Sequence, residues 1–280
     1  MPSSNDLAKA LRALHVPGKP LVLPNIWDEA SLRTLLSLNT PSSQTVRAVA
    51  TASWAVAAAR GAADEDLTFE QNLDAIRAVA PVCVAASVPL STDLQDGYGA
   101  RVAEVVSAVV SAGAHGANME DCYLDVGHGK GIEGSLYPLD EQVSRIKTAL
   151  KAAADAGCPD FALNARCDVF KLDEATGLDD ETRMKEALAR GKAYLEAGAT
   201  TVFFWGGMRG LRTAEVKRLV DELGGKVAVL LTRKDGGHSV AELAEIGVAR
   251  ISVGPSLYLF AMDAVKKTAE RILGGGKLVA

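Results

Sequence analysis

Two clusters of acidic and glycine residues have the composition of a metal-binding site. Residues 89–99 read PLSTDLQDGYG, and residues 116–121 read GANMED. Asp93 and Glu120 each stand where a short apolar segment ends and a loop begins. If these segments are parallel strands of one barrel, their ends open at a shared mouth. Hard cations prefer carboxylate oxygens, so Asp93 and Glu120 are expected to converge on a single metal ion.

The elements that must position these residues alternate short apolar segments with longer amphipathic ones, which indicates parallel strands joined by helices. Strands are predicted at residues 21–24, 46–51, 88–93, 116–120, 161–166, 201–205, 227–231 and 251–253. Helices are predicted at 7–14, 69–79, 101–112, 140–156, 181–197, 214–223 and 240–246. This pattern predicts a single α/β domain over residues 1–280, a (β/α)8 TIM barrel. A doubly wound open sheet is the alternative, but no GxGxxG motif opens the first unit.

Composition argues against several classes of function. The chain has 280 residues, with 30 Lys and Arg against 35 Asp and Glu, and no block of one sign. This balance argues against a nucleic-acid partner. No apolar run approaches the roughly 18 residues of a membrane span, so no membrane partner is expected. The four cysteines lack CxxC spacing, which is typical of free thiols, and a soluble cytoplasmic protein is expected.

The ends of the predicted strands carry polar side chains that could bind a small acid. They are Asn25, Trp27, Asp28, Ser53, Trp54, Asp93, Gln95, Asp96, Glu120, Asp121, Asn164, Arg166 and Asp168. Oxygen ligands dominate this set, and no His pair or Cys cluster accompanies them, so Mg2+ or Mn2+ is expected rather than zinc. Any one acid alone fits a helix cap or a solvated loop equally well. Their coincidence at successive strand ends favours a site.

Several motifs together resemble the isocitrate lyase and phosphoenolpyruvate mutase superfamily. They are TAS at 51–53, the pattern of residues 89–99, ED at 120–121, NARCD at 164–168, RGKAYLEAGA at 190–199 and VARISVGP at 248–255. The resemblance implies an enzyme, a carbon–carbon lyase or decarboxylase that acts on a small 2-oxo or 2-hydroxy dicarboxylic acid through a Mg2+-stabilised enolate. A phosphoenolpyruvate mutase-like or phosphonopyruvate hydrolase-like P–C enzyme is an alternative. A non-catalytic 2-oxo acid binding protein is another.

The resemblance also implies the metal site. Asp93 matches the direct metal ligand, and Glu120 matches an acid that acts through water. Gln95 stands where the family has a further acid, which removes one negative charge from the metal shell. Asp64 matches an acid of the loop after the second strand and is a candidate catalytic residue.

Substrate binding is implied at a second set of residues. Arg166 matches the arginine that binds the substrate carboxylate, for which its planar fork is well suited. Backbone N–H groups near Ser53 and Trp54 are expected to share that carboxylate. Asn25, at the end of the first predicted strand, completes the candidate substrate-binding residues. The expected partner is thus a small-molecule carboxylate.

The segment after the fourth predicted strand departs from the isocitrate lyase pattern. Those enzymes carry Lys-Lys/Arg-Cys-Gly-His, whose cysteine protonates the departing carbanion, whereas residues 124–131 here read LDVGHGKG. Val126 at the cysteine position has no ionisable proton, so cleavage of isocitrate or methylisocitrate by the usual route is not expected. His128 is the candidate replacement acid, with a solvated surface residue as the alternative. The glycines of residues 127–134 predict a flexible lid, with a plain solvent-exposed loop as the alternative.

Three further expectations concern the rest of the chain. Lys234 after the seventh predicted strand could form a Schiff base, as in an aldolase. Residues 252–256, SVGPS, could bind phosphate by analogy with other barrels. Family members exchange the eighth helix between subunits, so the resemblance implies that residues 256–273 are swapped in a homo-oligomer, expected to be a tetramer.

Overall fold

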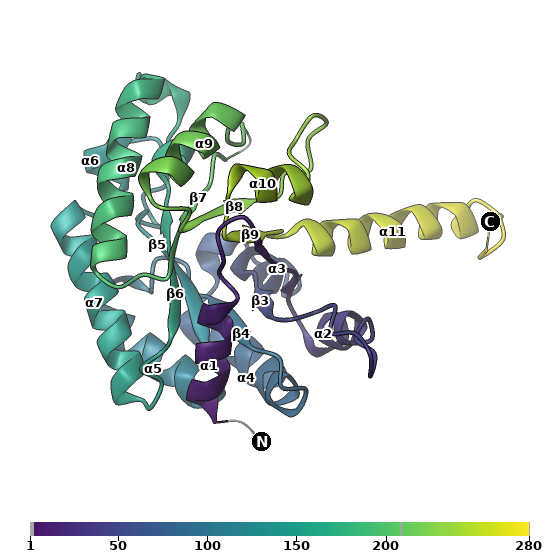
Figure 1. Ribbon diagram of the computed structural model, residues 1–280. Coiled ribbons are helices and arrows are strands. Elements are labelled where there is room, and N and C mark those ends of the chain that lie inside the picture. The colour runs from purple at the N-terminus through teal and green to yellow at the C-terminus, as the bar shows by residue number, and fades with distance from the viewer. Residues whose placement is uncertain (1–2, 208, 280) are drawn as a thin grey trace.

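A computed structural model describes residues 3–207 and 209–279 of the chain. All its strands are parallel and follow the order β1-β9-β8-β7-β6-β5-β4-β3-β2 (Figure 1). β1 (Leu21–Leu23) pairs with β9 (Arg250–Ser252), and β2 (Asn25–Ile26) pairs with β3 (Val49–Thr51). Pro24 separates β1 from β2, because proline has no N–H to donate to the ladder. The two short strands are therefore halves of the first predicted strand, and the predicted (β/α)8 barrel is confirmed.

The remaining strands supply charged side chains that line the barrel mouth. They are β4 (Leu90–Asp93), β5 (Gly116–Glu120), β6 (Ala162–Cys167), β7 (Thr201–Phe204) and β8 (Val227–Leu230). In the pairing of β4 with β5, Asp93 is opposite Asn118. In the pairing of β5 with β6, Glu120 is opposite Arg166. The register thus brings an acid and a base together at the carboxyl ends of two neighbouring strands.

Helices surround the strands (Figure 1). They are α1 (Ser4–Ala13), α2 (Glu29–Leu36), α3 (Ser53–Ala58), α4 (Phe69–Ala85), α5 (Val102–Ala112), α6 (Gly131–Ser135), α7 (Leu139–Asp155), α8 (Asp180–Glu196), α9 (Thr213–Glu222), α10 (Val240–Ile246) and α11 (Ser256–Leu273). The prediction ended the fourth of these at residue 79, but α4 continues through Pro81. The short helices α2, α3 and α6 were not predicted. No helix in residues 3–207 and 209–279 is long and apolar enough to cross a membrane.

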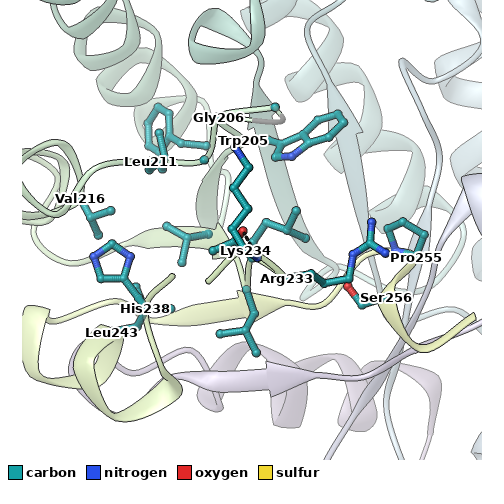
Figure 2. A pocket seen from close by; sticks show the side chains of 17 residues that line it. Trp205, Gly206, Leu211, Val216, Arg233, Lys234, His238, Leu243, Pro255 and Ser256 are labelled. Atoms are coloured by element: carbon teal, nitrogen blue, oxygen red, sulfur yellow. Dashed lines mark hydrogen bonds between the residues drawn. The ribbon is translucent and has the colours of Figure 1, made fainter. Parts of the chain in front are cut away.

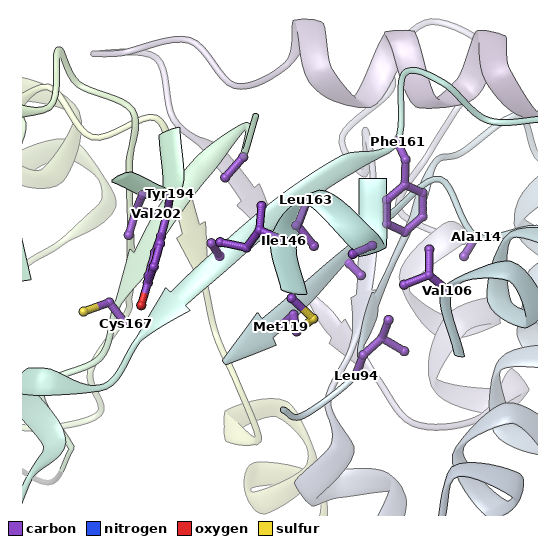
Figure 3. Packing of buried hydrophobic residues seen from close by; sticks show 14 of the residues in the cluster. Leu94, Val106, Ala114, Met119, Ile146, Phe161, Leu163, Cys167, Tyr194 and Val202 are labelled. Atoms are coloured by element: carbon purple, nitrogen blue, oxygen red, sulfur yellow. The ribbon is translucent and has the colours of Figure 1, made fainter. Parts of the chain in front are cut away.

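The main apolar core lies between the strands and the helices (Figure 3). Ala117 and Met119 of β5 belong to it, whereas Asn118 and Glu120 are polar. Successive side chains of a strand point to opposite faces, so this alternation places Asn118 and Glu120 inside the barrel. There Asn118 Oδ1 accepts hydrogen bonds from Asn164 and Arg250. The barrel interior is thus polar at the level of Asn118 and above it, where it forms the candidate site, whereas Leu11, Leu21 and Leu23 belong to a separate apolar cluster.

The last helix, α11, projects away from the barrel (Figure 1). Ser256, at its first position, is its one buried residue among those described. Phe260 and Val265 are 61% and 60% exposed. An apolar surface of this kind is typical of a helix that packs against another chain.

Candidate active site

Arg166, at the end of β6, is the centre of a charged network at the barrel mouth. Its Nη1 pairs with the carboxylate of Glu120 on β5. On the other side, Nε and Nη2 donate to Oδ1 and Oδ2 of Asp168 at 2.6 and 2.7 Å. The guanidinium carbon lies 4.5 Å from the ring centroid of Trp205. The two carboxylates and the indole together fix the plane of the guanidinium.

His128 joins this network through Asp168. Its Nε2 lies 3.0 Å from Asp168 Oδ2, and its side chain is 16% exposed. Burial acts to raise the pKa of Asp168, but Arg166 and His128 outweigh it and hold that pKa well below its usual range. Asp168 is therefore an anion at neutral pH and orients the imidazole. His128 is accordingly not a solvated surface residue.

The segment predicted as a flexible lid, residues 127–134, is partly helical. Gly131–Ser135 forms α6, and the hydroxyl of Ser135 accepts a hydrogen bond from the N–H of Lys130 at 3.0 Å. The N–H of Asp173 donates to the carbonyl of His128 at 3.1 Å. These hydrogen bonds place His128 beside the loop that follows β6.

Asp93 lies across the mouth at the end of β4. Its Oδ2 accepts hydrogen bonds from the N–H and the hydroxyl of Ser53, both at 3.0 Å. Gln95 donates through Nε2 to the carbonyl of Asp64 at 2.6 Å and to Asp64 Oδ1 at 3.2 Å. Ser53 and Gln95 are thus engaged in orienting the acids of the site.

The carboxyl groups of the mouth repel one another. Burial raises the pKa of Asp64, and the charge of Asp93 raises it further. Burial raises the pKa of Glu120 to about 8, with Arg166 opposing the shift and Asp168 and Asp93 adding to it. A divalent cation would offset this repulsion. The available donors are carboxylate and amide oxygens, which fit Mg2+ or Mn2+.

A different group has the close spacing of metal ligands. Ligand atoms of Cys122, His128 and Asp168 lie within 4.8 Å of one another, and within the described ranges this is the one group of at least three such residues. Both carboxylate oxygens of Asp168 already accept from Arg166, which makes this group less suited to a cation than its spacing indicates. The convergence of Asp93 and Glu120 on one ion stays a prediction.

Asn25 and Trp54 lie at the edge of the mouth. Asn25 donates through Nδ2 to the carbonyl of Thr51 at 2.8 Å, and its Oδ1 accepts from the N–H of Val253 at 3.2 Å. Its amide therefore joins strand ends on either side of it. The ring of Trp54 is 6.0 Å from that of Tyr258 on α11. Whether either residue binds substrate stays a prediction.

Sequence reasoning missed Lys171 and Trp205. The Lys171 ammonium lies 4.2 Å from the ring centroid of Trp205. Burial lowers the pKa of Lys171, and the charge of Arg166 lowers it further. Lys171 follows Asp168 by one 3-10 turn, Val169–Lys171, and Trp205 directly follows β7. The signal in the sequence that could have found them is that both residues lie close to the ends of predicted strands.

A buried network below the site supports the Asp168 loop. Asp121 Oδ1 accepts from the N–H of Asp168 at 2.9 Å. Asp121 Oδ2 accepts from Tyr194 Oη at 2.7 Å and from Arg190 Nη1 at 3.2 Å. In the sequence, the motif at 190–199, which contains Arg190 and Tyr194, was notable only because it resembles the family. The structure shows its physical role.

The fold and the mouth define a (β/α)8 barrel protein with an arginine and carboxylate network at the strand ends. Residues 11–273 match the phosphoenolpyruvate phosphomutase family, and the chain belongs to this family. A solved structure from Burkholderia cenocepacia J2315, described as a candidate phosphonomutase, is 35% identical with a TM-score of 0.81. The match covers 98% of this chain and 100% of that one.

Curated relatives include lyases and a decarboxylase. The 2-methylisocitrate lyase of Escherichia coli (strain K12) is 34% identical over 139 residues, which is 49% of this chain and 42% of the lyase. The oxaloacetate decarboxylase of Rhodopseudomonas palustris (strain ATCC BAA-98 / CGA009) is 28% identical over 204 residues, or 72% of this chain and 64% of the decarboxylase. The matched region thus spans less than two thirds of either relative.

Proposed function

We propose that this chain is a Mg2+- or Mn2+-dependent carbon–carbon lyase or decarboxylase that acts on a small 2-oxo or 2-hydroxy dicarboxylic acid. The observation that supports this most is the position of Arg166, fixed between Glu120 and Asp168 at the mouth. The relatives named as 2-methylisocitrate lyase and oxaloacetate decarboxylase favour the same chemistry.

Arg166 is proposed to bind the substrate carboxylate. Its contacts with Asp168 and Glu120 use Nε and one donor on each terminal nitrogen, so Nη1 and Nη2 each retain a donor. These are suited to a carboxylate of the ligand. Of the two expected backbone donors, Ser53 is already bonded to Asp93, so Trp54 is the better candidate.

Asp93, Glu120, Gln95 and Asp64 are proposed to hold the cation, directly or through water. When bound, the cation supplies Lewis-acid stabilisation of negative charge on the oxygens of a 2-oxo acid. Ser53 orients Asp93, and Gln95 orients Asp64, through the hydrogen bonds described above. Asp64 would act in catalysis by orienting water in this shell.

His128 is proposed to donate the proton that Val126 cannot. Its Nε2 is bonded to Asp168, which leaves Nδ1 as the nitrogen that can transfer a proton. Asp168 orients the imidazole for such a transfer, in which the ring acts as a general acid.

A substrate screen followed by NMR tests this function. The panel contains oxaloacetate, 2-methylisocitrate, 2-alkylmalates, isocitrate and phosphonopyruvate, each with Mg2+ and a blank without protein. We expect consumption of a 2-oxo or 2-alkylmalate acid and negligible consumption of isocitrate and 2-methylisocitrate. Turnover of phosphonopyruvate alone would favour the P–C alternative. Binding without turnover of any compound would favour the 2-oxo acid binding protein.

The assembly and location of the protein are proposed on separate grounds. The exposed apolar residues of α11 favour a homo-oligomer in which this helix packs on another subunit, with a tetramer expected. All four cysteines are free and buried, which is typical of a reducing compartment and favours the cytoplasm.

A further inference from the structure

A pocket of about 390 Å3 opens beside Trp205, between the ends of β7 and β8 and the start of α11 (Figure 2). We call it the Trp205 pocket. Its apolar lining includes Phe204, Leu211, Val216, Val229 and Leu243. This volume is at the low end of pockets that bind small molecules. A wall of this kind favours a ligand with a hydrocarbon body.

Two cations of the loop after β8 border the Trp205 pocket. Lys234 extends toward Trp205, and Arg233 extends toward Ser256 (Figure 2). Neither side chain forms an ion pair with another residue in the described parts of the chain. Lys234 therefore lies next to the apolar lining with its charge available, as an anionic ligand would require.

Trp205 is shared between this pocket and the proposed carboxylate site. It lines the pocket, and its ring also contacts the Arg166 guanidinium and the Lys171 ammonium. The indole Nε1 is buried and has no hydrogen-bond partner among the described residues. Trp205 is therefore the member of the Arg166 network that also lines the pocket, and the pocket meets the proposed carboxylate site at this residue.

We infer that the Trp205 pocket binds the distal part of the substrate, an apolar segment that ends in a second carboxylate. This inference rests on the proposed function, because it takes the first carboxylate to be bound at Arg166. Arg233 and Lys234 bind the second carboxylate, and the apolar lining contacts the carbons between the two. The substrate class is thus a 2-oxo or 2-hydroxy dicarboxylate with a long or alkyl-substituted body.

Calorimetry with ligands of increasing length tests this inference on the full chain with Mg2+. Oxalate probes the Arg166 site alone, and the series from 2-oxoglutarate through 2-oxoadipate and 2-oxopimelate to 2-oxosuberate adds one methylene at a time. We expect affinity to rise about two- to fourfold per methylene until the pocket is filled. We also expect 2-oxosuberate to compete with oxalate.

The double variant Arg233→Gln/Lys234→Gln tests the cations, which are exposed and should tolerate the change. It should weaken the binding of 2-oxosuberate at least tenfold more than the binding of oxalate. Lys226→Gln, an exposed lysine at the opposite end of β8, is the matched control and should change neither.

The outcomes separate this inference from the proposed function. If oxalate binds but affinity does not rise along the series, or if the double variant weakens both ligands equally, the inference is overturned while the Arg166 site stands. Simultaneous binding of oxalate and 2-oxosuberate would also overturn it. If oxalate does not bind at all, the proposed function itself fails.

Discussion

Arg166 and Asp168, two residues apart at the end of β6, are joined by two parallel hydrogen bonds of 2.6 and 2.7 Å. The same guanidinium pairs with Glu120, and the same carboxylate contacts His128. Arg166 and His128 are thus coupled through one anion. The residue proposed to bind the substrate and the residue proposed to donate a proton are therefore positioned together.

Arg166→Lys should weaken oxalate binding by about 1–3 kcal/mol, because an ammonium keeps the charge but not the planar fork. Calorimetry with Mg2+ measures the change. Arg212→Lys, an exposed arginine paired with Asp180, is the control and should bind oxalate as the unmodified chain does. An unchanged dissociation constant for Arg166→Lys would show that Arg166 does not bind the ligand.

Asp121→Asn should lower the free energy of unfolding by about 3–5 kcal/mol, because it leaves Arg190 buried without its anionic partner on this side. Tyr194→Phe keeps the ion pair but removes the hydrogen bond to this carboxylate and the one accepted from Arg190, and it should cost about 1–2 kcal/mol. Urea denaturation compares the two variants. Equal losses would contradict the account of this network.

His115 should make the protein less stable in mild acid. Its Nδ1 accepts from the N–H of Leu90 at 3.0 Å, and burial lowers its pKa from 6.5 to about 4. Between these values the unfolded chain binds a proton that the folded chain does not, so stability is present above pH 6.5 and is lost as the pH falls toward 4.

His115→Gln keeps a hydrogen-bond acceptor but does not titrate. As the pH falls from 6.5 toward 4, the variant should gain stability relative to the unmodified protein by up to about 1.4 kcal/mol of unfolding free energy per pH unit. His15, whose pKa burial also lowers, and the acids of the mouth are present in both and cancel. A difference that does not vary with pH would show that His115 is protonated equally in both states.

Phe260→Asp with Val265→Asp should dissociate the proposed oligomer, because both apolar side chains are exposed on α11. Light scattering measures the mass. Leu38→Asp, at a 55% exposed leucine outside α11, is the control and should leave the assembly intact. A single species of 29.3 kDa for the unmodified chain would refute the oligomer.

The sequence predicted the barrel well because apolar runs and capping glycines are local signals. α10 was predicted with its observed bounds, and β5 likewise. Contacts between residues that are far apart in the sequence could not be predicted from such local signals. His128 and Asp168 are 40 residues apart, and only the parallel register of β5 with β6 brings Glu120 to Arg166. Lys171 ends a single 3-10 turn and Trp205 directly follows β7, and such short segments have no periodic pattern that marks which side chains turn toward the mouth.

The central claim is that the mouth binds its carboxylate ligand together with a divalent cation, and oxalate calorimetry with Mg2+ and then with excess EDTA tests it most directly. We expect EDTA to weaken binding at least tenfold. Asp93→Asn should reduce the effect of Mg2+, whereas Asp66→Asn, an exposed acid near Asp64, should not. Equal binding with Mg2+ and with EDTA, together with borohydride trapping of a 2-oxo acid on Lys234, would contradict the claim and favour a Schiff-base enzyme.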